Sequence, residues 1–126
     1  MQYGCIAAHL GHSFSPEIHA LLGEYPYDLK ELAPEEVGPF LEKGDFLGIN
    51  VTIPYKKDVI PYLDEIDEAA LAIGAVNTVV NKNGRLYGYN TDFYGMTMLL
   101  CHAGISLFGQ KVVILGTGGT SQTNAR

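Results

Sequence analysis

Four segments of the chain carry hydroxyl, amide, ammonium and carboxylate groups where hydrophobic packing alone would not place them. They are residues 12–16, 48–56, 75–80 and 88–92. Hydroxyls at the start of a helix can bind a carboxylate, and a lysine beside an aspartate can pass a proton to or from a hydroxyl. One interpretation of the segments is therefore a site that binds a small acid and exchanges a proton with it, and structural roles are the alternative.

Ser13 and Ser15 flank Phe14 directly before a predicted helix. Ser15 as the N-cap and Pro16 as the first helical residue would explain one of the hydroxyls in structural terms. That interpretation leaves Ser13 without a role. Two hydroxyls at a helix N-terminus would also suit a bound carboxylate. A helix cap and an anion site are both open interpretations of this segment.

Lys56 and Asp92 are the residues that could exchange a proton with a substrate. Lys56 falls near the start of a predicted helix, where the macrodipole disfavours a cation by ~0.3–1 kcal/mol. It either faces an anionic or polar group or is a solvated lysine beside Lys57. Asp92 directly precedes a helix, so it is either an N-cap or the carboxylate partner of Lys56.

Asn77 stands within an apolar predicted strand. A buried amide there must find partners, because an unsatisfied one costs on the order of several kcal/mol. A structural hydrogen bond is the commoner outcome for such a residue, and contact with a ligand is the alternative.

A glycine-rich turn lies near the end of the chain. Residues 111–115 predict a short buried strand, which runs directly into Gly116-Thr117-Gly118-Gly119. Such a strand and turn open a dinucleotide-binding βαβ unit, where the glycines let the backbone approach a pyrophosphate. An ordinary strand-to-helix turn is the alternative, since Ser121 stands where a third glycine is expected. The unit needs roughly thirty residues, so we expect a two-domain nucleotide-dependent enzyme cut just after its second domain starts.

The elements that must position these residues alternate between strands and helices. Strands are predicted at residues 3–8, 25–32, 47–52, 76–81, 85–89 and 111–115. Helices are predicted at residues 15–23, 34–44, 57–63, 65–73 and 93–102. Ile18, Leu21 and Leu22 fall on one face of the first helix. Lys82-Asn83-Gly84 predicts the turn of a hairpin.

This order predicts an α/β fold: a three-layer sandwich with a mostly parallel sheet and one antiparallel hairpin, followed by the start of a Rossmann-type domain. The predicted domains are residues 1–103, which would bind substrate, and residues 104–126, which would hold the connection and the truncated start of the nucleotide-binding domain.

Composition limits the classes of partner. A net charge of −6 and a pI near 5.0 argue against nucleic acid or an anionic membrane. No apolar run reaches the ~20 residues of a membrane span, and no signal peptide is visible. Cys5 and Cys101 are expected to be buried free thiols, which favours a cytoplasmic location. The four histidines match no zinc spacing, so no metal site is expected.

Taken together, the segments resemble the shikimate dehydrogenase family over essentially the whole chain. The family's motifs S-x-S-P, N-V-T-x-P-x-K, G-A-x-N-T, N-T-D-x-x-G and G-x-G-G stand at residues 13–16, 50–56, 74–78, 90–95 and 116–119. One departure precedes the serine motif, where Ala7, Ala8 and His9 replace the usual glycine, polar residue and proline.

The resemblance implies an NADP-dependent oxidoreductase that interconverts 3-dehydroshikimate and shikimate. In this family's terms the carboxylate ligands are Ser13 and Ser15, the hydroxyl ligands are Thr52, Asn77 and Asp92, the proton donor is Lys56, paired with Asp92, and the cofactor turn holds Gly116, Gly118 and Gly119. The 126-residue chain alone is expected to be inactive, because most of the NADP site would be absent. Self-association is also expected, through surface that the missing part of the nucleotide-binding domain would otherwise cover.

Two alternatives to this function stay open. One is a dehydrogenase that also uses quinate, although Ser15 stands where a bulkier hydroxyl residue is expected in quinate users. The other is a non-catalytic module that binds a small acid, if the natural chain ends at Arg126.

Overall fold

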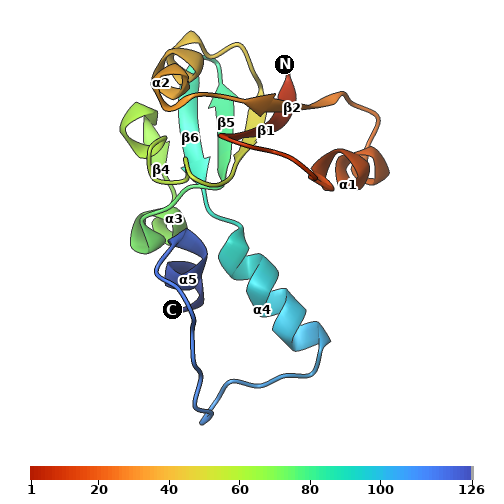
Figure 1. Cartoon of the computed structure of the whole chain (residues 1–126), viewed down its shortest axis with the longest axis vertical. Helices are drawn as coiled ribbons and strands as arrows, with labels where there is room; N and C mark the ends of the chain where they lie inside the picture. The colour runs from red at the N-terminus through yellow and green to blue at the C-terminus, as the bar shows by residue number, and fades with distance from the viewer. Residues whose placement is uncertain (126) are drawn as a thin grey trace.

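The computed structural model describes residues 1–125, without the side chains of Gln122 and Asn124 (Figure 1). Its strands are β1 (Tyr3–Ala7), β2 (Tyr27–Glu31), β3 (Gly48–Val51), β4 (Glu65–Ile66), β5 (Thr78–Lys82) and β6 (Arg85–Tyr89). Its helices are α1 (Ser15–Leu22), α2 (Pro34–Lys43), the short 3₁₀ helix η1 (Ile60–Tyr62), α3 (Glu68–Ile73), α4 (Asp92–His102) and α5 (Gly119–Asn124).

The strands form one mixed sheet in the order β2-β1-β3-β5-β6-β4. β1 is parallel to both of its neighbours, and β4 is parallel to β6. β5 is antiparallel to β3 as well as to β6. The predicted α/β class, mostly parallel sheet and hairpin are confirmed. Asn83 (φ 55°) and Gly84 (φ 85°) make the hairpin turn, because a two-residue turn with positive φ at both positions matches the twist of the strands.

The main hydrophobic core lies on one face of the sheet. Side chains alternate between faces along a strand, so Ile6, Ile49 and Val79 all point to this face, beneath α2, η1 and α3. Val37 and Leu41 of α2 complete the cluster. This layer makes the sheet a rigid support for whatever lies on its other face.

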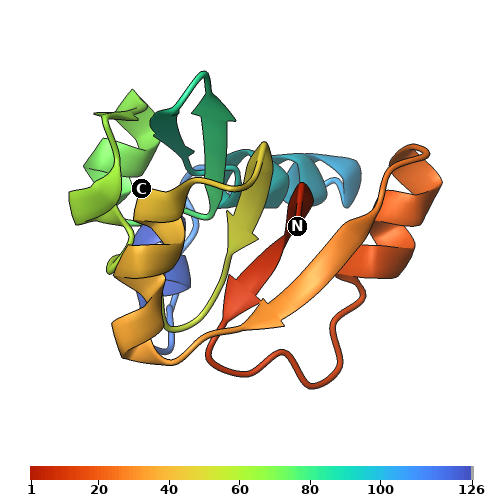
Figure 2. The same cartoon turned by 90° about the horizontal axis from the view of Figure 1, so that it is seen from above.

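The opposite face of the sheet carries a small apolar cluster of Cys5, Ala7 and Leu10, with polar side chains beside it. The registers of β1, β3, β5 and β6 align Cys5, Asn50, Thr78 and Tyr89 in one row across it. α1 packs on this side against β2, so helices lie on both faces and the predicted three layers are confirmed (Figure 2). Amide and hydroxyl groups in this row are available for a site.

α1 contacts the sheet through a histidine rather than through its apolar residues. The His19 ring stacks on Tyr27 with centroids 3.8 Å apart, and its Nδ1 lies 2.7 Å from the Tyr25 hydroxyl. The predicted apolar face of this helix is exposed, with Leu21 at 88%. That face turns away from the sheet because aromatic residues of β2 and the segment before it take the helix contact.

Four further expectations from the sequence are wrong in the structure. Residues 57–63 form turns followed by η1, and β4 replaces the first turn of the helix predicted at 65–73. Cys101 is exposed, although Cys5 is buried as expected. Residues 111–115 are not a strand. A strand is held by the backbone of a neighbour, and within residues 1–125 no strand pairs with this segment.

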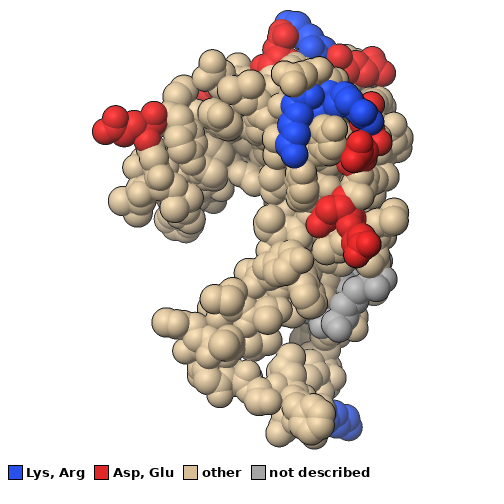
Figure 3. Space-filling model, turned by 180° about the vertical axis from the view of Figure 1, so that it is seen from behind, with Lys and Arg blue, Asp and Glu red and all other residues tan. Residues whose placement is uncertain are grey.

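α4 and the connection that follows it extend away from the sheet as an arm (Figure 1). Residues 93–125 contain one charged side chain, Lys111, so in Figure 3 the charged groups gather over the sheet and its helices while the arm is almost free of them. Tyr94, Met98, Leu99 and Phe108 are exposed on it. Such a surface is typical of one that another part of a protein covers.

Candidate active site

Lys56 and Asp92 meet at one end of the sheet. The Lys56 Nζ donates a hydrogen bond to the Asp92 Oδ2 at 2.5 Å, with 15% and 32% of the two side chains exposed. Lys56 reaches this point from the turns after β3, and Asp92 is the first residue of α4 after β6. The structure therefore gives Asp92 the role of carboxylate partner. The N-cap of α4 is Thr91, so the alternative interpretation of Asp92 as an N-cap is wrong.

Asn77 holds the second oxygen of Asp92. Its Nδ2 donates to Asp92 Oδ1 at 2.9 Å and to the Thr91 hydroxyl at 2.9 Å. Its Oδ1 accepts from the Thr91 N–H and from the Thr78 hydroxyl, both at 3.0 Å. With 8% of the residue exposed, the amide is satisfied by protein groups. Asp92 is thereby left with one oxygen on Asn77 and the other on Lys56.

Asn90 fixes the backbone that leads into α4. Its Nδ2 donates to the Ala75 carbonyl at 2.9 Å, and its Oδ1 accepts from the Asp92 N–H at 3.0 Å. Asn90 is 1% exposed. Sequence reasoning did not select it as a site residue, although it stands in the same motif as Asp92. A polar residue at the end of an apolar strand was the available signal.

Ser13, and not Ser15, supports the start of α1. Ser15 is the first residue of α1, and Phe14 occupies the N-cap position without a side-chain cap. The Ser13 Oγ accepts from the Ser15 N–H at 3.3 Å. The predicted cap at Ser15 is therefore wrong, because the backbone enters the helix one residue earlier and the hydroxyl of Ser13 satisfies the first free amide. Ser13 supports the helix start, and the Ser15 hydroxyl is available elsewhere.

Tyr27 lies beside Ser15 on the face of the sheet opposite the main core. Its hydroxyl donates to Asn50 Oδ1 at 2.6 Å. Burial raises the pKa of Tyr27 well above its ordinary value, the nearby Cys5 adds to the rise, and the Ser15 side chain opposes it. Burial also raises the pKa of the Cys5 thiol, against the charge of Lys56. Both groups are thus neutral near pH 7 and act here as hydrogen-bonding and packing groups. Neither Tyr27 nor Asn50 was predicted as a site residue.

Thr52 lies where β3 ends and the turn toward Lys56 begins. Its N–H donates to the Ile6 carbonyl at 3.1 Å, and its carbonyl accepts from the Tyr55 N–H at 2.9 Å. The Tyr55 hydroxyl donates to the Leu32 carbonyl at 2.5 Å. These bonds tie the Lys56 segment to the core, so Lys56 is held by ordered backbone.

The glycine turn comes back beside Lys56. A hollow of about 470 Å³ lies between residues 53–57 and residues 115–121, and Lys56, Gly116 and Gly118 are among its lining residues. Gly116 has φ 126°, which residues with a side chain rarely adopt. Gly118 is the N-cap of α5, whose start has no side-chain cap. The turn thus presents bare backbone to the same space that Lys56 faces.

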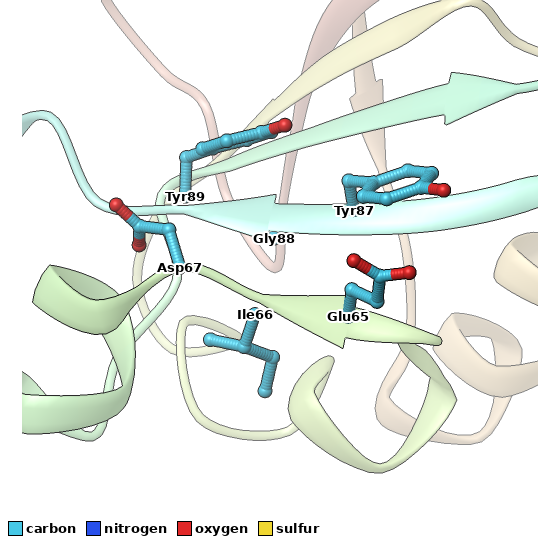
Figure 4. A pocket seen from close by; sticks show the side chains of 6 residues that line it. All are labelled: Glu65, Ile66, Asp67, Tyr87, Gly88 and Tyr89. Atoms are coloured by element: carbon cyan, nitrogen blue, oxygen red, sulfur yellow. The ribbon is translucent and has the colours of Figure 1, made fainter.

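A separate hollow of about 140 Å³ lies between β4 and β6. Figure 4 shows its lining, with Tyr87 and Tyr89 on one side of the sheet and Ile66 pointing to the other. None of the predicted site residues lines it.

The described part of the chain shows neither a metal cluster nor a membrane-spanning helix. Within residues 1–125, no group of three or more His, Cys, Asp or Glu side chains is placed to hold a metal ion. In the same residues, no helix combines the length and the apolar character needed to span a bilayer.

Comparison with known proteins connects this geometry to a family. The family described as "Shikimate dehydrogenase substrate binding domain" matches residues 5–79. The chain is 43% identical to the shikimate dehydrogenase (NADP(+)) of Clostridium beijerinckii, over 95% of this chain and 47% of that protein. It is 47% identical to the enzyme of the same name from Halothermothrix orenii, over 94% of this chain and 44% of the relative. The chain thus spans about half the length of these curated relatives.

Solved structures agree with the fold. The crystal structure of shikimate dehydrogenase 1 from Peptoclostridium difficile matches with a TM-score of 0.91 and 38% identity, over 99% of this chain and 50% of that one. Shikimate 5-dehydrogenase from Thermus thermophilus, solved in complex with NADP(H) and shikimate, matches with a TM-score of 0.89 and 33% identity, over 98% and 49% of the two chains.

Proposed function

This chain belongs to the shikimate dehydrogenase substrate binding domain family, and from that membership we propose that it supplies the substrate site of an NADP-dependent shikimate dehydrogenase. The reaction is the interconversion of 3-dehydroshikimate and shikimate. The observation that carries the proposal is the pairing of Lys56 with Asp92 beside the glycine turn. A small acid with ring hydroxyls matches the polar groups around that pair.

In this proposal Lys56 moves the proton. During reduction its ammonium donates a proton to the carbonyl oxygen as that oxygen gains charge, and in the reverse direction its amine accepts the proton of the alcohol. Asp92 keeps the amine oriented through Oδ2, while Asn77 keeps Asp92 in place through Oδ1. The pair is mostly sheltered from water, which strengthens its electrostatic effect on the reacting oxygen.

The remaining substrate groups would be bound on either side of Lys56. Ser13 and Ser15 would bind the carboxylate at the start of α1, where the helix dipole favours a negative charge. Thr52, Asn77 and Asp92 would bind the ring hydroxyls. Asn77 would do so with the Nδ2 hydrogen that it otherwise donates to the Thr91 hydroxyl, while its other Nδ2 hydrogen remains bonded to Asp92.

The glycine turn fits a pyrophosphate. Gly116 adopts a conformation that favours glycine, and a Cβ built at Gly118 meets nothing within 4 Å, so the backbone there is open to a ligand. Gly116, Gly118 and Gly119 would hold the phosphates of NADP. When bound, NADP supplies or accepts the hydride of the reaction.

The proposed domain division is residues 1–103 for substrate and residues 104–126 for the start of the NADP-binding domain. The exposed apolar arm supports this division, since the remainder of such a domain would cover it. Left uncovered, the arm would favour self-association. The two free cysteines support a cytoplasmic location, because disulfides are characteristic of oxidising compartments.

The 126-residue chain should bind shikimate weakly and should not oxidise it with NADP⁺. It offers ligands for the carboxylate and hydroxyls but does not enclose the substrate, so a dissociation constant on the order of millimolar is expected. Titration of the ¹⁵N-labelled chain followed by NMR would measure it. The methyl ester of shikimate, which lacks the charged carboxylate, is the matched control ligand and should bind more weakly.

Amide shifts confined to residues away from Ser13, Lys56 and Asp92, or no saturable shift, would contradict the proposed site. Robust NADP-dependent turnover by the verified 126-residue chain would contradict the proposed domain division. Quinate in the same titration would show whether the site tolerates its extra hydroxyl.

Serine substitutions separate carboxylate binding from helix support. Ser15→Ala should weaken shikimate binding severalfold with little change in the free energy of unfolding, since Ser15 caps nothing. Ser13→Ala should weaken binding and also destabilise the chain, near the lower end of the ~0.5–1.5 kcal/mol that a hydrogen bond contributes. Urea unfolding and the NMR titration would measure both. Unchanged affinity in Ser15→Ala would remove Ser15 from the carboxylate site.

A further inference from the structure

We propose that Tyr27, Asn50 and Thr78 are positioning residues, whose side chains form one hydrogen-bonded chain from the Ser15 end of the site to Asp92. The inference deepens the proposed function and rests on it for the catalytic meaning of Asp92. The hydrogen bonds themselves do not depend on which substrate binds. None of the three residues belongs to the ligand set assigned above.

The chain of hydrogen bonds is continuous across four strands of the sheet. The Tyr27 hydroxyl donates to Asn50 Oδ1 at 2.6 Å, and Asn50 Nδ2 donates to the Thr78 Oγ1 at 3.3 Å. The Thr78 hydroxyl then donates to Asn77 Oδ1 at 3.0 Å, and Asn77 Nδ2 donates to Asp92 Oδ1 at 2.9 Å. Every donor faces the carboxylate, so each bond polarises the next and the series ends on a negative charge.

The three residues sit on rigid elements. Asn50 and Thr78 are register partners on neighbouring strands, and β1 lies between Asn50 and the strand of Tyr27. The Tyr27 ring spans that gap and is held by its stack on His19. Sites built on strands are more accurately positioned than sites built on loops. The side chains of Tyr27, Asn50 and Thr78 are therefore suited to fixing the position of Asp92, the first residue of α4.

A structural role alone does not account for the hydrogen-bonded series of Tyr27, Asn50, Thr78 and Asn77. Apolar residues would cover the face at lower desolvation cost than two amides and two hydroxyls, and the main core lies on the opposite face. The series also begins at Tyr27, whose ring stacks on His19 of the helix that Ser15 begins. The hydrogen-bonded series thus connects a residue packed against α1 to the carboxylate of Asp92.

Thr78 is the link to remove, because valine has the same shape without the hydroxyl. In the ¹⁵N-labelled chain without substrate, Thr78→Val should shift the Nδ2H₂ signals of Asn77, and Thr78→Ser should restore them. Tyr27→Phe should move the same Asn77 signals, although the two residues do not touch. Tyr87→Phe, on the same face but outside the series, is the matched control and should leave them unchanged.

A backbone spectrum that retains the wild-type pattern establishes that each variant is folded. Given that pattern, unchanged Asn77 signals in both Thr78→Val and Tyr27→Phe would overturn the proposal, and so would equal shifts in Tyr87→Phe. These NMR measurements use no shikimate. They therefore test the hydrogen-bonded series even if the chain does not bind shikimate and the proposed function is wrong.

Activity tests the catalytic consequence separately. In the full-length protein, Thr78→Val should lower kcat about tenfold or more, because a small misplacement of Asp92 is amplified in the rate. KM for shikimate should change less, and Thr78→Ser should recover most of the rate. A Thr78→Val enzyme with normal kcat, or one whose KM rises while kcat is unchanged, would reject the positioning role.

Discussion

Lys56→Ala should lower kcat of the full-length protein by about 10²–10⁴-fold, the usual contribution of general acid–base catalysis. KM for shikimate should change less, because Ser13 and Ser15 would still hold the carboxylate. The loss arises because the reacting oxygen would have to exchange its proton with water instead of with a positioned amine. Initial rates of NADP⁺ reduction at varied shikimate would measure both constants.

Lys57→Ala is the matched control for this experiment. Lys57 is the adjacent residue and is exposed, so its loss removes the same charge from the surface without touching Asp92. Lys57 also lines the hollow beside the glycine turn, so Lys57→Ala should change KM for NADP⁺ at most and should retain near-normal kcat at saturating NADP⁺. A Lys56→Ala enzyme with the kinetics of Lys57→Ala would end the assignment of Lys56 as proton donor.

Asp92→Asn should also reduce kcat by at least about 10²-fold, since it keeps the shape but removes the charge that orients Lys56. In the proposed mechanism the two residues act as one unit, so the double variant Lys56→Ala/Asp92→Asn should be little worse than the poorer single variant. The measurement is a double-mutant cycle on kcat. Losses that simply multiply would show that Lys56 and Asp92 act independently.

The exposed pair Lys43 and Asp45 is the control cycle. Its atoms lie 2.9 Å apart, with 73% and 69% of the two side chains exposed. Such pairs contribute little in water, so Lys43→Ala, Asp45→Asn and their combination should leave kcat unchanged. A comparable loss in this cycle would mean that the effects at Lys56 and Asp92 come from general changes in charge.

Local rules made part of this structure predictable. Pro34 at the first turn of α2 and Gly44 in the left-handed conformation after it delimit that helix close to where they were expected. The hairpin turn at Asn83 and Gly84 was predicted for the same reason, because its backbone needs residues that accept positive φ. In each case the residues that decide the conformation are neighbours in the sequence.

Motif order also pointed to Lys56, Asn77 and Asp92, but their contacts could not be read from it. Helix-cap rules suggested that Ser15 and Asp92 are N-caps, and both are instead first residues of their helices. A shift of one residue at a helix start is within the ordinary error of such rules. At the start of α1 this shift means that the Ser13 hydroxyl bonds to the backbone, and the Ser15 hydroxyl is free to bind a ligand.

The sequence by itself determined the alternation of strands and helices, the tight turns and the residue types available for chemistry, because these depend on side chains a few positions apart. Only the tertiary structure decided which groups meet. Residues 111–115 have a strand's composition but no partner among residues 1–125, and the apolar side of α1 is exposed because His19 takes its contact with β2. Lys56 follows β3 and Asp92 follows β6, and the series from Tyr27 to Thr78 joins β2, β3 and β5, so sheet order and register bring these residues together.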